Sequence, residues 1–282
     1  MIDIIIDGGA TKADWRVLDK GKLIHSFQSP GLHPLVQSPL ELSAKLVTIL
    51  EQNPDLANSN QLYYYGSGCS GEAQQKEMRD HFRPFFPNSS LYVDGDLLGA
   101  AKACCGNNPG IVGILGTGSN SCVYDGKRIT DNIPSLGYMM GDEGSGFSIG
   151  KSIIKAYFYR QMPAELASIF ESWIPGGRPE VLEYLYQQEN PNVYVSRFAA
   201  FAHEHKANTF CQNLVKECFS AFVVQQLRHY KEAIPNNPIH FVGSIAYLWT
   251  EILEEVLLAH DLQLGKVLRR PIEALVAYHS KT

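Results

Sequence analysis

The sequence lacks the patterns of several protein classes, and each absence excludes one of them. Its six cysteines form no Cys-x-x-Cys pair, which excludes zinc-ribbon and ferredoxin-like sites, and adjacent Cys104 and Cys105 are expected as small core residues of a helix. No apolar run reaches the roughly 18 to 20 residues of a membrane span, and the start has no basic stretch of a signal peptide. The formal net charge of −5 offers no basic surface for nucleic acid or anionic lipid. We therefore expect a cytoplasmic protein with reduced thiols and neither nucleic-acid nor membrane partners.

Two common nucleotide-binding motifs are also missing. There is no G-x-x-x-x-G-K-[ST] run, and the first glycine-rich turn leads into no helix, so neither a Walker A loop nor a dinucleotide fingerprint is present. The chain instead uses one device twice, in which a strand, a glycine-rich turn and a second strand follow one another. The two copies are residues 2–15 and 110–123. This repeat predicts a duplicated fold with two phosphate-binding turns.

The hydrophobic pattern predicts strands and helices that fit such a duplication. The 282 residues are enough for two domains that each bury a core. The first part, to about residue 105, is predicted as three strands, a helix, a strand, a helix, a strand and a helix. The second part begins with three predicted strands and continues mostly with helices. Its predicted elements are strands at 111–115, 119–124, 127–133, 239–242 and 262–264, and main helices at 146–159, 208–230, 247–259 and 271–278.

The first turn carries residues suited to a phosphate group. Asp7 ends a buried strand, so its carboxylate should emerge at the edge of the sheet. Gly8 and Gly9 would let backbone N–H groups approach an anion closely. Thr11 and Lys12 would add a hydroxyl group and a positive charge for a β- or γ-phosphate. The alternative is a plain hairpin with a surface lysine.

The second turn, Gly116-Thr117-Gly118-Ser119-Asn120, again offers N–H and hydroxyl groups. It too could be an ordinary hairpin. Because both turns occur at matching places in two similar halves, we favour phosphate binding for both.

These motifs together resemble a known family. Asp7-Gly8-Gly9 with Thr11-Lys12, the second turn, and the run from Met140 to Gly146 (sequence MGDEGSG) occur in this order. Over essentially the whole chain they resemble the N-acetylglucosamine kinase branch of the BadF/BadG/BcrA/BcrD-type ATPases, within the actin, sugar kinase and heat-shock chaperone superfamily. The resemblance implies an α/β fold of two ribonuclease-H-like (actin-like ATPase) domains, with ATP and magnesium in a cleft between them. The expected domains are 1–108 with 269–282, and 109–268 with helical insertions.

The resemblance also implies roles for single residues. Asp96 would be the general base that takes the proton of a sugar hydroxyl, with Asp94 as a rival and helix capping as the alternative role. Asp7 would hold magnesium, through water. Gly243 and Ser244 would form the adenosine segment, in which Ser244 stands where the superfamily usually has a second glycine.

The sugar site implied by the resemblance contains Asp142 and Asn120, with Ser70 as a further candidate. A carboxylate suits a polyol because it can accept hydrogen bonds from two hydroxyls. Asp142 could alternatively serve only the start of a helix. His33 stands where the kinases tend to have Asn in contact with the sugar, and Leu136 stands where animal members have Trp.

We therefore expect an enzyme that transfers phosphate from ATP to an amino sugar, with N-acetylglucosamine 6-phosphate as the first candidate product. The alternatives are a kinase for glucosamine or a muramic derivative, an activator ATPase of the BadF type, and a non-catalytic sensor of nucleotide or sugar. Activators of that type carry a cysteine-bound iron–sulfur cluster, and no cysteine here fits that pattern. Homodimers are common in the family, but no residue identifies an interface.

Overall fold

A computed structural model describes residues 1–9, 11–234 and 237–280, and these residues form two compact units. Unit 1 comprises Met1–Pro109, Tyr124–Ile129 and Arg270–Thr282, and unit 2 comprises Gly110–Val123 and Thr130–Arg269. The chain therefore leaves unit 1 near residue 110 and returns to it for its last helix. The hairpin turn at 124–129 counts with unit 1, although it lies within the expected second domain, 109–268.

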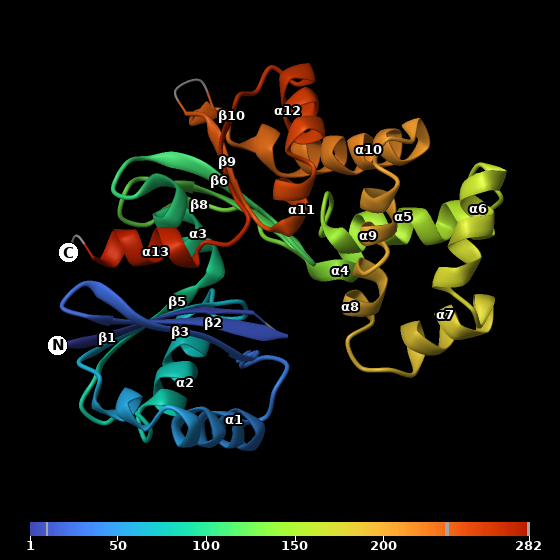
Figure 1. The fold of residues 1–282 in the computed structure, drawn as a ribbon. Helices are drawn as coiled ribbons and strands as arrows, with labels where there is room; N and C mark the ends of the chain where they lie inside the picture. The colour runs from blue at the N-terminus through green and yellow to red at the C-terminus, as the bar shows by residue number, and fades with distance from the viewer. Residues whose placement is uncertain (10, 235–236, 281–282) are drawn as a thin grey trace. The chain divides into compact units, whose positions relative to one another are not determined.

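Unit 1 is a five-stranded sheet with helices on both faces (Figure 1). Its continuous Ile4–Ile6 run is fully buried in the central strand, as the β-branched pattern predicts. Helices α1 and α2 cover one face, and α3 and α13 cover the other. The elements are β1 (Ile2–Gly8), β2 (Lys12–Asp19), β3 (Lys22–Pro30), α1 (Pro39–Gln52), the 3₁₀ helix η1 (Pro54–Asn58), β4 (Gln61–Gly66), α2 (Glu72–Phe82), β5 (Ser90–Gly95), α3 (Asp96–Cys105) and α13 (Ile272–His279).

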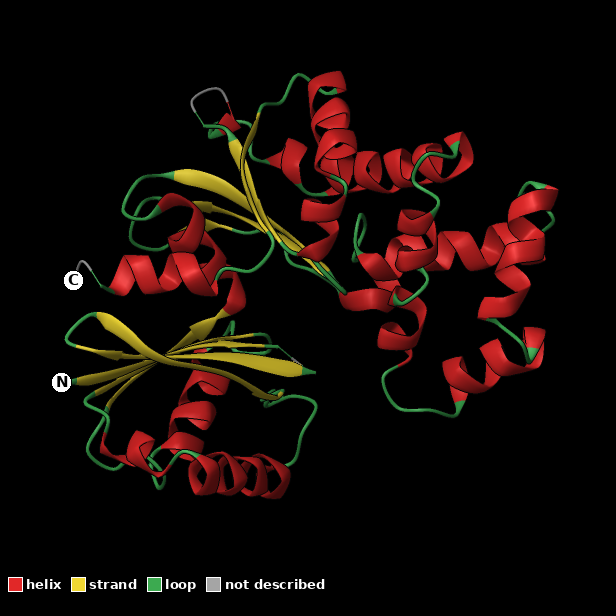
Figure 2. Cartoon of the chain, viewed as in Figure 1, coloured by secondary structure: helices red, strands yellow, loops and turns green. Residues whose placement is uncertain are grey.

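Unit 2 holds a second five-stranded sheet and most of the helices, which appear in red in Figure 2. Its core is rich in phenylalanine from α6, α9 and α10, including fully buried Phe170, Phe201 and Phe219. The elements are β6 (Gly110–Leu115), β7 (Ser119–Tyr124), β8 (Ile129–Asp131), α4 (Gly137–Met140), α5 (Gly146–Phe158), α6 (Ala164–Phe170), η2 (Glu171–Trp173), α7 (Gly177–Tyr186), α8 (Pro191–Ser196), α9 (Ala199–Glu204), α10 (Thr209–Gln225), η3 (Leu227–His229), β9 (Ile239–Val242), α11 (Ser244–Leu248), α12 (Thr250–Ala259) and β10 (Leu264–Leu268).

The two sheets have the same topology, which confirms the predicted duplication. The strand order is β3-β2-β1-β4-β5 in unit 1 and β8-β7-β6-β9-β10 in unit 2. In each sheet the strand before the glycine-rich turn is central, and it pairs in parallel with the fourth strand of its unit. The two turns therefore follow equivalent strands.

Several predicted boundaries in unit 2 are wrong. The strand predicted at 127–133 spans only Ile129–Asp131, and the last strand is Leu264–Leu268 instead of 262–264. The long helix predicted to residue 230 ends at Gln225 and is followed by η3, while the helix predicted at 247–259 is two helices, α11 and α12. Apolar spacing continues through such short breaks, so periodicity alone does not reveal them. Cys104 and Cys105 are buried in α3, as expected. Among the described residues, no helix combines the length and the apolar character that a membrane span requires.

Candidate active site

Asp7, at the end of the central strand of unit 1, feels the charge of two other carboxylates, Asp14 and Asp96. Asp7 and Asp14 are direct partners in the antiparallel β1–β2 pairing, and Asp96 is the first residue of α3. The pKa of Asp7 is raised to about 7, chiefly by burial and further by the negative charges of Asp96 and Asp14. The positive charges of Arg270 and Lys12 oppose it. The strand end is therefore a place where negative charge is crowded and cations are attracted.

Asp14 and Arg270 were not among the residues that sequence reasoning selected. The Asp14 side chain is buried, accepts a hydrogen bond from Gln28 Nε2 at 2.7 Å, and lies 3.5 Å from Arg270 Nη1. The register of a tight hairpin would have placed Asp14 opposite Asp7, because the two residues flank the turn symmetrically. No local signal connects Arg270 to this place, since it comes from the far end of the chain.

Of the two candidates for the base, Asp96 and not Asp94 is the one whose charge raises the pKa of Asp7. It is partly buried, and burial raises its pKa, while hydrogen bonds from the backbone N–H groups of Leu97 and of Asp96 itself oppose the rise. The cap of α3 is Gly95, so Asp96 is not the N-cap residue. Asp94 instead accepts a hydrogen bond from Gln75 Nε2 at 3.4 Å and faces the charge of Lys102.

Two of the predicted sugar-site residues, His33 and Ser70, lie at a loop that contacts Gly95, the residue before Asp96. The imidazole of His33 lies against Gly68, where an added Cβ would come within 2.5 Å of its Cε1 atom. The loop that contains Gly68 also contains Ser70, and Ser70 contacts Gly95: a Cβ added to Gly95 would lie 3.4 Å from the Cα of Ser70. Burial lowers the pKa of His33, so the ring is neutral at neutral pH. Its Nδ1 accepts a hydrogen bond from the Leu35 N–H at 3.3 Å, which leaves the proton on Nε2 as a donor.

The first turn differs from the expectation in one respect. The Gly9 N–H donates to the Lys12 carbonyl at 2.9 Å and closes the hairpin, so this amide does not face an anion. Gly8 is required for packing, because a Cβ there would lie 2.5 Å from the Tyr64 ring. Thr11 and Lys12 are exposed. The hydroxyl and ammonium groups therefore remain the phosphate-binding candidates in this turn, while its glycines serve the backbone.

In unit 2 the second turn lies against the start of α5 and against Gly243, which begins the predicted adenosine segment. The Gly116 carbonyl accepts from the Gly146 N–H at 2.8 Å, and the exposed Thr117 accepts through its carbonyl from the Phe147 N–H at 3.1 Å. Gly243 has φ of +129°, and a Cβ there would lie 2.1 Å from the Leu115 carbonyl oxygen. Only glycine fits this position. Exposed Ser244 begins α11 beside it.

Asp142 ties the second turn to the segment before α5. It is buried at φ of +59°, and its Oδ1 accepts from the Ser119 N–H at 3.1 Å and from Ser135 Oγ at 2.9 Å. Its carboxylate also fills the space beside Gly118. Asp142 therefore holds the turn in shape, a role that sequence reasoning did not include.

Asn120 has a fixed amide orientation. Its Oδ1 accepts from the Ser121 N–H at 2.9 Å and from Asn132 Nδ2 at 3.1 Å. The amide nitrogen is thereby left to donate to a ligand. Ser135 and Asn132, which hold Asp142 and Asn120, carry no motif that would have singled them out in the sequence.

Comparisons with known proteins agree with this fold. A search against models of known protein families finds no match. Among solved structures, a candidate N-acetylglucosamine kinase from Porphyromonas gingivalis is 35% identical, with a TM-score of 0.94 over 99% of each chain. The chain belongs to the N-acetylglucosamine kinase-like family of sugar kinases.

Two more distant members of the fold extend the comparison. A candidate N-acetylglucosamine kinase from Chromobacterium violaceum matches with a TM-score of 0.75 at 16% identity, over 98% of each chain. A ROK-family glucokinase from Streptomyces griseus, solved with glucose and AMPPNP, matches with a TM-score of 0.56 at 12% identity, over 99% of this chain and 98% of that one. At these identities the likeness shows the fold alone. The family thus has the two-domain, actin-like architecture that the duplicated sheets display.

Among the described residues, no group of three or more His, Cys, Asp or Glu side chains could hold a metal ion directly. Magnesium keeps most of its hydration shell in proteins, so two facing carboxylates such as Asp7 and Asp14 suit it as partners through water.

Proposed function

We propose that the protein is an ATP-dependent kinase that phosphorylates an amino sugar, with N-acetylglucosamine converted to its 6-phosphate as the first candidate reaction. The observation that carries this proposal is the 35% identity over 99% of the chain to a candidate kinase of that type. The proposal includes membership of the BadF-type group, which the order of the motifs supports, and work in the cytoplasm. The buried carboxylates of unit 1 supply a physical basis for the chemistry.

Asp96 is the general base of the proposed reaction. It would accept the proton of the sugar hydroxyl as that oxygen attacks the γ-phosphorus of ATP, and the bond to the β,γ-bridging oxygen breaks to release ADP. Burial raises the pKa of Asp96, which makes its carboxylate a stronger base than an exposed aspartate. The backbone N–H groups at the start of α3 hold the carboxylate in place. Phosphoryl transfer depends on this positioning and on charge neutralisation.

Each unit supplies candidate nucleotide-binding residues of its own. From unit 1, Lys12 and Thr11 are exposed at the first turn, and Asp7 with its facing partner Asp14 would bind magnesium through water. Bound magnesium would neutralise charge on the phosphates. From unit 2, the close approach of Gly243 to the second turn leaves a backbone surface that a side chain would fill. Gly116 to Ser119 would contact phosphate there, and Ser244 would lie near the nucleoside.

The sugar would be recognised by a mixture of donors and acceptors. Asn120 and neutral His33 present N–H donors, which suit the carbonyl of an N-acetyl group. Asp142 has one oxygen engaged by two donors and a second that could accept from a sugar hydroxyl, and exposed Ser70 could do either. A kinase for glucosamine or a muramic derivative is the alternative, and it would be separated from the first candidate by the preference for the acetylated sugar.

The proposal is tested by comparing two neighbouring aspartates. Wild-type protein should release ADP from ATP only when N-acetylglucosamine is present. Asp96→Asn should lose about a hundredfold to ten-thousandfold in kcat while the sugar still binds, whereas Asp94→Asn should retain most of the activity. If Asp96→Asn turns over near the wild-type rate, the assignment of the base is wrong. If no sugar stimulates ADP release by the wild type, the proposed function is wrong.

A further inference from the structure

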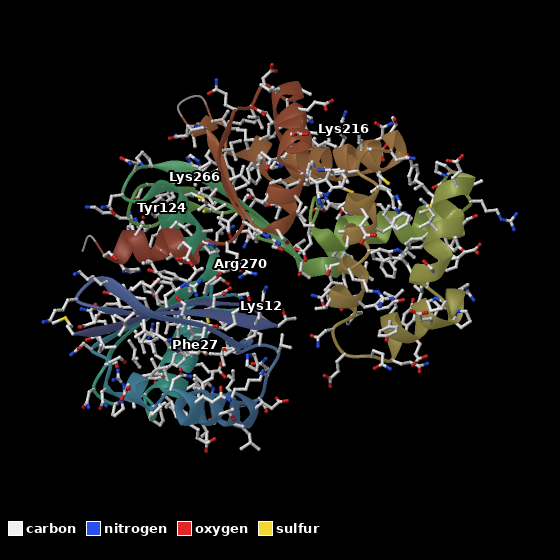
Figure 3. The ribbon with its side chains drawn as sticks, in the orientation of Figure 1. Lys12, Phe27, Tyr124, Lys216, Lys266 and Arg270 are labelled. Atoms are coloured by element: carbon white, nitrogen blue, oxygen red, sulfur yellow. The ribbon has the colours of Figure 1, made fainter. Side chains whose placement is uncertain are left out.

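Arg270 reaches the carboxylates of unit 1 from the other end of the chain. It is the first residue after the chain returns from unit 2, and Figure 3 labels it together with Lys12. Its Nη1 lies 3.5 Å from Asp14 Oδ1, and its charge also acts on Asp7. Arg270 and Lys12 are thus two cations that accompany one pair of facing carboxylates.

The contact with Asp14 engages only part of the Arg270 side chain. A guanidinium group carries five N–H donors in a planar fork, and the contact with Asp14 engages one nitrogen. The side chain is 44% exposed, in contrast to that of Asp14, which is 6% exposed. Asp14 also has Gln28 as a closer donor, at 2.7 Å. The arginine is therefore accessible to a ligand at a place where Asp14 keeps another partner.

Arg270 is also not the anchor of the last helix. A second ion pair joins β2 to α13, in which Arg16 donates to Glu273 Oε1 through Nε at 2.9 Å and through Nη2 at 2.5 Å. The Arg16 side chain is 12% exposed and donates to the Trp15 carbonyl as well. Because this pair and the buried Ile272 and Leu275 hold α13 on the sheet, the exposed arginine needs another explanation.

We propose that Arg270 binds the terminal phosphate of the nucleotide and stabilises the phosphoryl group as it is transferred. A planar fork of donors matches phosphate oxygens, and charge neutralisation is the main demand of this chemistry. Arginine remains protonated throughout, so it contributes hydrogen bonds and charge but exchanges no proton. The inference rests on the proposed function for the transfer step, while its binding part requires only that the protein binds ATP.

The experiment compares nucleotide affinities and turnover in three variants. Calorimetry with Mg²⁺ would give the preference for AMPPNP over ADP in wild type, Arg270→Met, Arg270→Lys and the control Glu273→Gln, which breaks the other ion pair of α13. Arg270→Met should reduce the preference for AMPPNP about tenfold or more and lower the sugar-dependent kcat about a hundredfold. Arg270→Lys should have a preference for AMPPNP and a kcat between those of Arg270→Met and wild type. Glu273→Gln should stay within about threefold of wild type in both quantities.

The outcomes separate this inference from the proposed function. If Arg270→Met keeps the preference for AMPPNP, or if Glu273→Gln loses as much, the inference is overturned even when the wild type is an active kinase. If the wild type phosphorylates no sugar but Arg270→Met still loses the preference, the proposed function fails and the phosphate-binding role stands. Should Arg270→Met fail to fold, Arg270→Lys decides alone, because wild-type preference in that variant would contradict a role for the fork.

Discussion

Replacing Asp7 by Asn should stabilise the ligand-free protein in alkaline buffer while abolishing its activity. Burial and two neighbouring carboxylates raise the pKa of Asp7 from 3.8 to about 7. The folded state therefore binds a proton that the unfolded state releases, and stability falls as the pH rises from about 4 to 7. At 1.36 kcal/mol for each pKa unit the loss above pH 8 is at most about 4 kcal/mol, and partial exposure of Asp7 reduces it. Asn mimics the neutral carboxyl group and avoids this loss.

The measurement is denaturant unfolding of wild type and Asp7→Asn, with EDTA and without nucleotide, at pH 8.5 and pH 4.5. We expect the variant to be more stable by roughly 1 to 4 kcal/mol at pH 8.5 and by about 1 kcal/mol or less at pH 4.5. Asp80→Asn is the control, because Asp80 is exposed on α2 and a hydrogen bond from Lys76 lowers its pKa. That variant should gain nothing at pH 8.5. An Asp7 variant that is less stable than wild type at pH 8.5, or equally changed at both pH values, would refute the reasoning about crowded negative charge.

Three further predictions concern the other candidate residues. Gly243→Ala should destabilise the protein by about 2 kcal/mol or more and weaken nucleotide binding, because φ is +129° and the added Cβ would meet the Leu115 carbonyl. Calorimetric unfolding would measure the loss of stability, and titration with ADP would measure the loss of affinity. An unchanged Tm would contradict the close approach of Gly243 to Leu115. Ser135→Ala should lower the free energy of unfolding by about 1 kcal/mol, because the hydrogen bond to Asp142 is lost, and should raise the KM for the sugar. The control Ser172→Ala, on the surface, should alter neither quantity. Steady-state kinetics with both variants would measure the KM values. His33→Phe should raise the KM for N-acetylglucosamine about tenfold and change the KM for ATP little, because the ring keeps its place against Gly68 but loses the Nε2 donor. If the variant and the wild type have equal KM values for N-acetylglucosamine, His33 does not belong to the sugar site.

Local patterns in the sequence were sufficient to predict the duplicated sheets. The β-branched run in β1, the glycines after β1 and β6, and the three-strand start of each half all follow from short-range rules of strands and turns. The structure confirms the two equivalent sheets. It also brings His33 and Ser70 to the loop that contacts Gly95, a meeting that the resemblance implied without supplying its geometry.

Features that depend on contacts between residues far apart in the sequence could not be predicted from local patterns. Arg270 meets Asp14 only because the chain returns to unit 1 after the last residue of unit 2, Arg269, and places α13 on the sheet. The engagement of the Gly9 amide by the Lys12 carbonyl reflects the exact closure of a hairpin, which a glycine-rich composition leaves open. Asp142 was expected as a sugar ligand, and its bonds to Ser119 and Ser135 become visible only when the second turn folds beside it.

The central claim is that the protein phosphorylates an amino sugar, and the most direct test is to identify the product. Wild-type protein would be incubated with ATP, Mg²⁺ and each of N-acetylglucosamine, glucosamine, N-acetylmuramic acid and glucose, and the products would be analysed by phosphorus–proton correlation NMR. We predict one equivalent of ADP for each N-acetylglucosamine 6-phosphate formed, with phosphorus coupled to the C6 protons and no product from Asp96→Asn under the same conditions. Hydrolysis of ATP without any phosphorylated sugar, or an equal yield from Asp96→Asn, would contradict the account.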